Sequence, residues 1–291
     1  MTFFPDASQS YKHISTMVAL MSTDVISSLP VSSKKHSKSG VKSPIPTLAA
    51  VQHSMGDQLA RLAGAIIAGD EGNPFAVLGP HLDDKSGVMQ IRVFRPDAQK
   101  VAVIDSASGV MLCDLPRVHP AGFFASPIAG RHESFAYRLR FSFDGVDWEV
   151  EDPYAFGPTL TDLDLYLHAE GNYFRAYEKM GAHPIIKDGV AGVLFAVWAP
   201  DARRVSVVGD FNAWDGRVSI MRLRHGAGIW EIFLPGITAG CCYKYEIKTN
   251  AGALLLKADP FALAAECPPK TASVVRAALP ARKPLNGPPS H

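Results

Sequence analysis

The chain has 291 residues, which at about 150 residues per domain predicts about two domains. Apolar residues make up 47% of the sequence and charged residues 20%, close to the averages of globular proteins, which argues against wholesale disorder. The 29 Lys and Arg residues nearly balance the 28 Asp and Glu residues, so we expect neither nucleic acid nor an anionic membrane as the main partner.

No segment of the sequence predicts membrane insertion, secretion or a metal site. The apolar stretches fall short of the roughly 20 residues that cross a bilayer, and the N-terminus lacks a basic start followed by an apolar core. The four cysteines form no C-x-x-C motif, which excludes a zinc site and a disulfide framework. We therefore expect a cytoplasmic protein without metal or cofactor.

Residues 1–53 mix Ser, Lys, Pro and His without periodicity and predict a disordered tail. A helix follows: Ser54 and Asp57 have the spacing of a capping box, and Gly69 provides a helix end. Between them lies one apolar stripe, formed by Leu59, Leu62, Ala63, Ile66 and Ile67. We expect this helix to pack on the domain that follows it.

After the helix the apolar period changes to two, which is typical of β-strands. Four short runs predict a first β-sandwich within residues 54–158, namely 88–94, 100–104, 134–141 and 146–150. Five runs predict a second sandwich within residues 185–275, namely 193–198, 204–208, 228–233, 243–247 and 253–256. The fold class is therefore mainly β, with two tandem immunoglobulin-like β-sandwiches.

Residues 159–184 lie between the sandwiches and predict two short helices. Thr161 and Asp164 have capping-box spacing, and Gly171 and Gly181 suit helix ends. The last residues, 276–291, are rich in Pro and predict a second disordered tail.

The two predicted sandwiches are similar to each other in sequence. Residues 95–103 match residues 199–207, and Asp152-Pro-Tyr matches Asp259-Pro-Phe, with order and spacing preserved at offsets of 104 and 107. Repeats of this length are whole domains, so the sequence predicts a domain duplication.

The second copy resembles carbohydrate-binding modules of family 48. The resemblance is carried by three motifs, Phe195–Ala202, Gly209–Asp215 and Lys257–Pro260. The segment Glu170–Pro184 narrows it to the N-terminal part of bacterial 1,4-α-glucan (glycogen) branching enzymes, and motifs elsewhere agree with this, at Asn73–His81, Asp152–Gly157 and Thr271–Val275. The resemblance covers about residues 55–275 and implies glycogen or another α-1,4-glucan as partner.

That family forms α-1,6 branches by a retaining mechanism, which needs two carboxyl groups about 5 Å apart. The family holds them on an α/β barrel of about 250 residues. After Val275 only 16 residues remain, so we expect no barrel and no catalytic residue in this chain. The acids that cluster in the linker, Asp162, Asp164 and Glu170, are better explained as capping or solvated groups.

Glucan binding is the more plausible activity, because an exposed Trp can stack on the C–H face of a sugar while polar groups hold its hydroxyls. The resemblance implies Trp214, with Asn212 in the same segment, and Lys244 as glucan-binding residues. Each has an alternative: Trp214 as a packing residue and Lys244 as an ordinary exposed strand residue. Residues 250–254 hold no aromatic where related modules have a second stacking Trp. The strand positions of Trp198 and Trp230 predict core residues.

The sequence thus predicts a non-catalytic N-terminal region that binds or orients glucan and docks on a catalytic barrel. The alternative is a stand-alone glycogen-binding module, which predicts a soluble monomer. A debranching relative would lack the Glu170–Pro184 segment, and an interaction module unrelated to sugar would fit only the sandwiches. A docking surface left uncovered predicts self-association.

Overall fold

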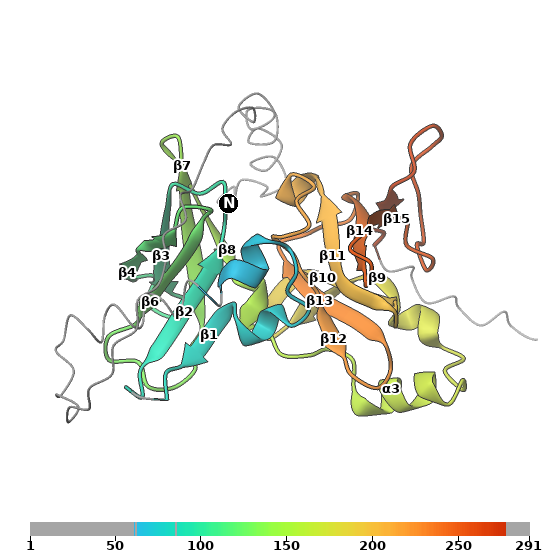
Figure 1. Cartoon of the computed structure of the whole chain (residues 1–291), viewed down its shortest axis with the longest axis horizontal. Helices are drawn as coiled ribbons and strands as arrows, with labels where there is room; N and C mark the ends of the chain where they lie inside the picture. Colours follow the sequence, from blue (N-terminus) through green and yellow to red (C-terminus); the bar gives the residue numbers. More distant parts are fainter. Residues whose placement is uncertain (1–60, 62, 85, 278–291) are drawn as a thin grey trace, which may run out of the picture.

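The structure is a computed structural model that describes residues 61–277, except 62 and 85 (Figure 1). The predicted tail at 1–53, the predicted helix start at Ser54 and Asp57, and residues 278–291 lie outside the described residues. Within them two β-sandwiches lie side by side, which confirms the predicted fold class. No described helix is long and apolar enough to span a membrane.

The first sandwich consists of two antiparallel sheets with strand orders β1-β2-β6-β5 and β4-β3-β7-β8. Its strands are β1 (Gly79–Leu82), β2 (Met89–Phe94), β3 (Lys100–Asp105), β4 (Met111–Leu115), β5 (Arg117–His119), β6 (Phe123–Pro127), β7 (Tyr137–Phe143) and β8 (Val146–Glu151). Val93 and Phe124 from one sheet meet Val103 and Phe141 from the other in a single apolar core. Two 3-10 turns flank it, Pro74–Ala76 and Pro153–Ala155.

The second sandwich pairs the sheet β12-β13-β10-β9 with the sheet β11-β14-β15, and β16 adds to β14. Its strands are β9 (Gly181–Lys187), β10 (Val190–Trp198), β11 (Ala202–Gly209), β12 (Arg222–Arg224), β13 (Ile229–Pro235), β14 (Cys242–Thr249), β15 (Leu254–Lys257) and β16 (Ser273–Val274). Phe195 and Trp230 from the first sheet pack on Val207 and Tyr245 from the second.

All nine predicted runs overlap strands of the structure, and seven further described strands were not predicted. Most of the missed strands are short or lie at sheet edges, where alternation is weak. Strand β9 begins at Gly181, so the last four residues of the expected helical linker are strand. Its Pro184 lies opposite Val193 in β10, and a proline is tolerated there because β9 is an edge strand.

The Asp-Pro-aromatic motif that recurs in the two copies performs the same structural task in each. In the first copy the buried Asp152 accepts a hydrogen bond from the hydroxyl of Tyr137 at 2.7 Å. In the second, Asp259 accepts one from the hydroxyl of Tyr243 at 2.6 Å. Both carboxylates also accept the backbone N–H two residues further on. The motif therefore ties the segment after the last long strand to the core in both sandwiches.

The linker between the sandwiches contains one α-helix, α3 (Asp162–Ala169), whose predicted capping box between Thr161 and Asp164 is present. The second predicted helix is only a 3-10 turn, Ala176–Glu178. The described residues 61 and 63–67 are helical, and Gly69, at φ 63°, ends that helix as predicted.

The two sandwiches are packed directly on each other. Ala63 and Ile66 of the N-terminal helix lie in one cluster with Phe94 of the first sandwich and Ile220 of the second. The hydroxyl of Tyr154 accepts the backbone N–H of Ile220 at 3.0 Å. The same hydroxyl donates to the carbonyl of Val218 at 3.1 Å. The helix thus contacts both sandwiches, whereas the sequence predicted contact with the first sandwich, which follows it in the chain.

Candidate functional site

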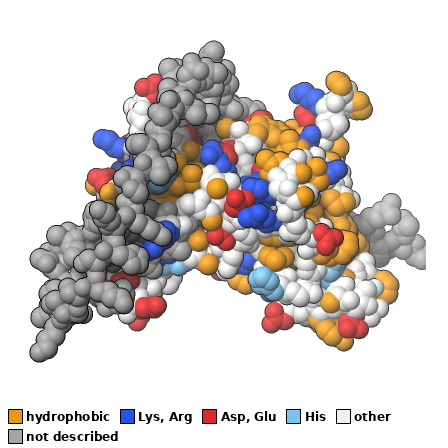
Figure 2. All heavy atoms as spheres, in the orientation of Figure 1, with side chains coloured by type: hydrophobic (Ala, Val, Ile, Leu, Met, Phe, Trp, Pro, Cys, Tyr) orange, Lys and Arg blue, Asp and Glu red, His pale blue; other side chains and the backbone are white. Residues whose placement is uncertain are grey.

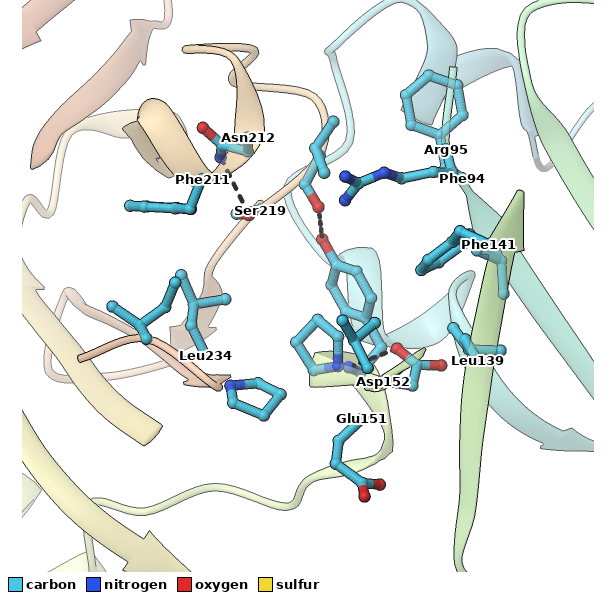
Figure 3. Close-up of a pocket in the computed structure, with 17 residues that line it drawn as sticks. Phe94, Arg95, Leu139, Phe141, Glu151, Asp152, Phe211, Asn212, Ser219 and Leu234 are labelled. Atoms are coloured by element: carbon cyan, nitrogen blue, oxygen red, sulfur yellow. Dashed lines mark hydrogen bonds between the residues drawn. The ribbon is translucent and has the colours of Figure 1, made fainter. Parts of the chain in front are cut away.

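The loop between β11 and β12 carries two of the predicted binding residues, and we call residues 209–218 the Trp214 loop. Asn212 is buried beneath it. Its Oδ1 accepts the backbone N–H of Gly209 at 3.0 Å. Its Nδ2 donates to the carbonyl of Val207 at 2.8 Å. The same Nδ2 donates to the hydroxyl of Ser219 at 3.1 Å (Figure 3). The side chain of Asn212 therefore positions the loop and does not face solvent.

Trp214 is held in a fixed orientation with part of its ring open to solvent. Its indole Nε1 donates to Oδ1 of Asp210 at 2.9 Å, and 37% of the residue is exposed. Ala213 and Trp214 both have positive φ, 52° and 60°. Each left-handed residue costs about 1 kcal/mol, so the contacts of Asn212 and Asp210 have to impose this turn. The outcome is an indole that presents a partly free face.

Lys244 lies next to the Trp214 loop because of the strand register. In the β11–β14 pair, Lys244 stands opposite Val208, and the next residue, Gly209, accepts the backbone N–H of Trp214 at 3.0 Å. The ammonium of Lys244 donates to the hydroxyl of Thr271 at 2.7 Å. Within the described part of the chain it forms no ion pair, so its charge is free to contact a ligand.

The same face of the sheet carries exposed leucines that sequence reasoning missed. Side chains two residues apart on a strand share a face, so Lys244 and Glu246 point the same way. Leu256 on β15 stands opposite Glu246, and Leu254 lies two residues before it on the same face. Both leucines are more than half exposed. Only the pairing of β15 with β14 places these leucines on this face, and the sequence alone does not give that strand register.

A buried ion pair holds the Trp214 loop against the sheet. Arg204 is buried, with its Nη1 donating to the carbonyl of Gly216 at 2.8 Å and its Nη2 paired with the carboxylate of Glu246. A Cβ at Gly216 would lie 2.0 Å from Glu246 Oε1, so a larger residue here would have to displace the Glu246 carboxylate. Asp215 is bound by the guanidinium of Arg217. Burial raises the pKa of Asp215, but these hydrogen bonds outweigh it and lower that pKa.

The acids of the linker have structural partners. Asp164 accepts from Thr161 and, at 2.5 Å, from the hydroxyl of Tyr173. Asp162 is fully exposed at the first turn of α3, 3.5 Å from Arg224. No cluster of three or more His, Cys, Asp or Glu side chains that could hold a metal occurs among the residues the structure describes. These acids cap and brace the linker.

A second surface gathers exposed apolar side chains around α3, and we call it the α3 face. Trp198, which was expected in the core, lies here and is 55% exposed, so that prediction was wrong. Its ring lies 6.0 Å from that of His168 on α3. The neighbouring linker adds Phe174, which is 84% exposed. Figure 2 shows apolar side chains at the lower right, where Figure 1 places α3. Trp230, by contrast, is buried as predicted.

Two family models match the chain. Residues 60–154 match the model described as alpha-1,4-glucan branching enzyme GlgB, N-terminal domain. Residues 179–262 match the model described as Carbohydrate-binding module 48 (Isoamylase N-terminal domain). Each model matches most or all of one sandwich, so the order of the two matches follows the order of the two folded units.

The chain is also similar to curated proteins named 1,4-alpha-glucan branching enzyme GlgB. It is 54% identical over 213 residues to that of Rubrobacter xylanophilus, covering 72% of this chain and 28% of the relative. It is 56% identical over 215 residues to that of Paramagnetospirillum magneticum, covering 73% and 28%. The chain thus matches little more than a quarter of these relatives' length.

Among solved structures, a pullulanase from Anoxybacillus sp. LM18-11 aligns with 68% of this chain and 27% of its own. The identity is 17% and the TM-score 0.29, which is too low a similarity to bear on function.

Proposed function

We propose that this chain, which belongs by sequence to the N-terminal region of 1,4-α-glucan branching enzymes (GlgB), binds α-1,4-glucan on the face formed by Trp214 and Lys244. The observation that carries the proposal is the fixed, partly exposed indole of Trp214 beside an ammonium without an acidic partner among the described residues. This face would orient glucan for the branching reaction, and the reaction itself is assigned to no residue described here.

The geometry of this face suits a sugar chain. An indole offers a flat apolar surface for the C–H face of a glucose unit, and a lysine can donate hydrogen bonds to hydroxyl groups. Leu254 and Leu256 extend the apolar surface along the sheet, where the sequence offers no second aromatic. Asn212 contributes by positioning the loop, since its amide is already bonded on the buried side.

The α3 face supports a further proposal, that this region docks on a catalytic domain. Tyr166 and Leu163 on α3 are about 60% exposed, and Trp198 and Phe174 are nearby on the same side of the second sandwich. Large apolar side chains gathered in this way are characteristic of interaction surfaces. Relatives of about four times the matched length have further chain to cover it. We propose the cytoplasm, where glycogen is made, as the location.

The experiment that tests glucan binding compares two exposed tryptophans. Trp214→Ala removes the proposed stacking residue, and Trp198→Ala is a matched control on the α3 face. Glycogen affinity is measured by co-sedimentation and by calorimetry with maltoheptaose. We expect Trp214→Ala to weaken binding and Trp198→Ala to leave it within about twofold.

The expected size follows from the exposed area. About 37% of a side chain of roughly 250 Å² is about 90 Å², worth about 2 kcal/mol when covered, or about 30-fold in Kd. Equal affinities of Trp214→Ala and the unsubstituted chain would overturn the proposal.

A further inference from the structure

A cleft lies where the two sandwiches face each other beneath the Trp214 loop. The turn Arg95–Asp97 of the first sandwich forms one wall, and Ala213, Asp215 and Arg217 form the other. Its volume is about 210 Å³. A second cavity of about 80 Å³ lies next to it between the sandwiches and shares Arg95, Asn212 and Val218 as lining residues. We call this space the inter-sandwich cleft.

Arg95 reaches into this space with unused hydrogen-bonding capacity. Figure 3 shows its side chain extending from the first sandwich toward the second. The side chain is 13% exposed, and its Nε lies 2.8 Å from Oδ1 of Asp97. Neither of these two buried atoms makes a well-aligned hydrogen bond. Within the described part of the chain, Nη1 and Nη2 of Arg95 have no hydrogen-bond partner. Arg95 lines the cleft, so these two outer nitrogens are available to hydrogen-bond a molecule that enters it.

The charges of the cleft indicate what kind of molecule would enter it. Arg95 is paired with Asp97, and Arg217 with Asp215, so the two guanidinium groups are matched by two carboxylates. An anion would meet as much repulsion as attraction there. A neutral molecule with many hydroxyl groups can accept from the guanidinium groups and donate to the carboxylates. Pro96 and Ala213 supply apolar wall for its C–H groups.

We infer that the inter-sandwich cleft is a second glucan subsite, into which a chain stacked on Trp214 continues. This rests on the proposed function, because the ligand is the same and Ala213, the residue before Trp214, lines the cleft. A chain long enough to occupy both places gains contacts with the first sandwich that a short chain does not. The first sandwich thereby takes part in glucan binding and in discrimination by chain length.

The test uses calorimetry of the full chain with maltotriose and with maltoheptaose. Arg95→Met removes the guanidinium and keeps an apolar stem against Phe141, over which Arg95 lies at 5.2 Å. Asp97→Asn changes the opposite charge with little change of shape. Arg175→Met is the control, since Arg175 is exposed on the linker. We expect both cleft variants to bind maltoheptaose about five- to tenfold more weakly, with maltotriose affinity and the control unchanged.

The outcomes separate this inference from the proposed function. If the unsubstituted chain binds maltoheptaose and Trp214→Ala weakens it, but folded Arg95→Met or Asp97→Asn bind it with unchanged affinity, the cleft subsite is refuted and the Trp214 face stands. Equal losses for maltotriose and maltoheptaose also refute the cleft subsite, because they show a general disturbance of the Trp214 loop. If Trp214→Ala has no effect on either sugar, both proposals fall.

Discussion

Replacing Asp152 by Asn removes a carboxyl group whose ionisation opposes folding. The residue is 3% exposed, and it accepts hydrogen bonds from the Tyr137 hydroxyl and the Tyr154 backbone N–H at 2.7 and 2.9 Å. Burial raises its pKa from 3.8 to about 6, despite these hydrogen bonds, which lower it. Because the pKa is higher in the folded state, that state binds the proton more tightly. The resulting stability is complete below about pH 4 and is lost as the pH rises through 6.

The magnitude follows from the shift of about two pKa units, which corresponds to about 3 kcal/mol. Urea denaturation of the unsubstituted chain and of Asp152→Asn, followed by circular dichroism from pH 4 to 7.5, measures it. The difference in unfolding free energy between the two proteins changes by about 2.5 kcal/mol over this range, because the unsubstituted chain becomes less stable relative to Asp152→Asn as the pH rises. Titrating groups that do not interact with Asp152, including Asp259, are common to both proteins and cancel. A difference that stays constant across this range refutes the reasoning, and Asp147→Asn, at an exposed position of β8, is the control.

Four further substitutions test the loop and the α3 face. Asn212→Ala removes three buried hydrogen bonds and is expected to lower the free energy of unfolding, measured by urea denaturation, by about 3 kcal/mol. It is also expected to weaken glucan binding. Unchanged stability and unchanged glucan affinity would contradict its positioning role. Arg204→Met leaves the mostly buried carboxylate of Glu246 unpaired and is expected to lower the free energy of unfolding by about 3 kcal/mol. The double variant Arg204→Met with Glu246→Leu is expected to lose less stability than the sum of the two single variants. Strictly additive losses would contradict the coupling of the two residues. The α3 face predicts self-association at high concentration in sedimentation, and Phe174→Asp is expected to reduce it; a monomer at all concentrations contradicts this.

Local patterns predicted the long strands and the domain duplication, because alternation and turn residues are properties of neighbouring positions. The exposure of Trp198 could not be predicted from such local patterns. On β10, Leu194 and Ala196 share its face and both are buried, so the strand pattern indicates a core position. Ala196 packs in one cluster with Leu160 and Met180 of the linker. The linker's cover does not extend over the end of the strand, where Trp198 is exposed. Only the tertiary path of the linker decides this.

The candidate site was predictable only in part for the same reason. Trp214 and Lys244 came from the resemblance to glucan-binding modules, and the strand register places Lys244 beside the start of the Trp214 loop. Asn212 belongs to the same motif, yet its amide points inward to Val207 and Ser219. Asparagine occurs in turns in both orientations, so its sequence position does not settle which groups it contacts. The cleft at Arg95 depends on how two separate domains pack, which no local pattern encodes.

Glucan binding at Trp214 is tested most directly by a titration with maltoheptaose, followed by the indole N–H signals in a ¹H–¹⁵N spectrum. The chain has four tryptophans, so each signal is a reporter at a known place. Trp214 lies on the proposed face, Trp198 on the α3 face, and Trp148 and Trp230 within the two sandwiches. If glucan binds on the Trp214 face, the Trp214 signal moves in a saturable way while the other three stay in place. A Trp214 signal that remains still while maltoheptaose binds would contradict binding on that face.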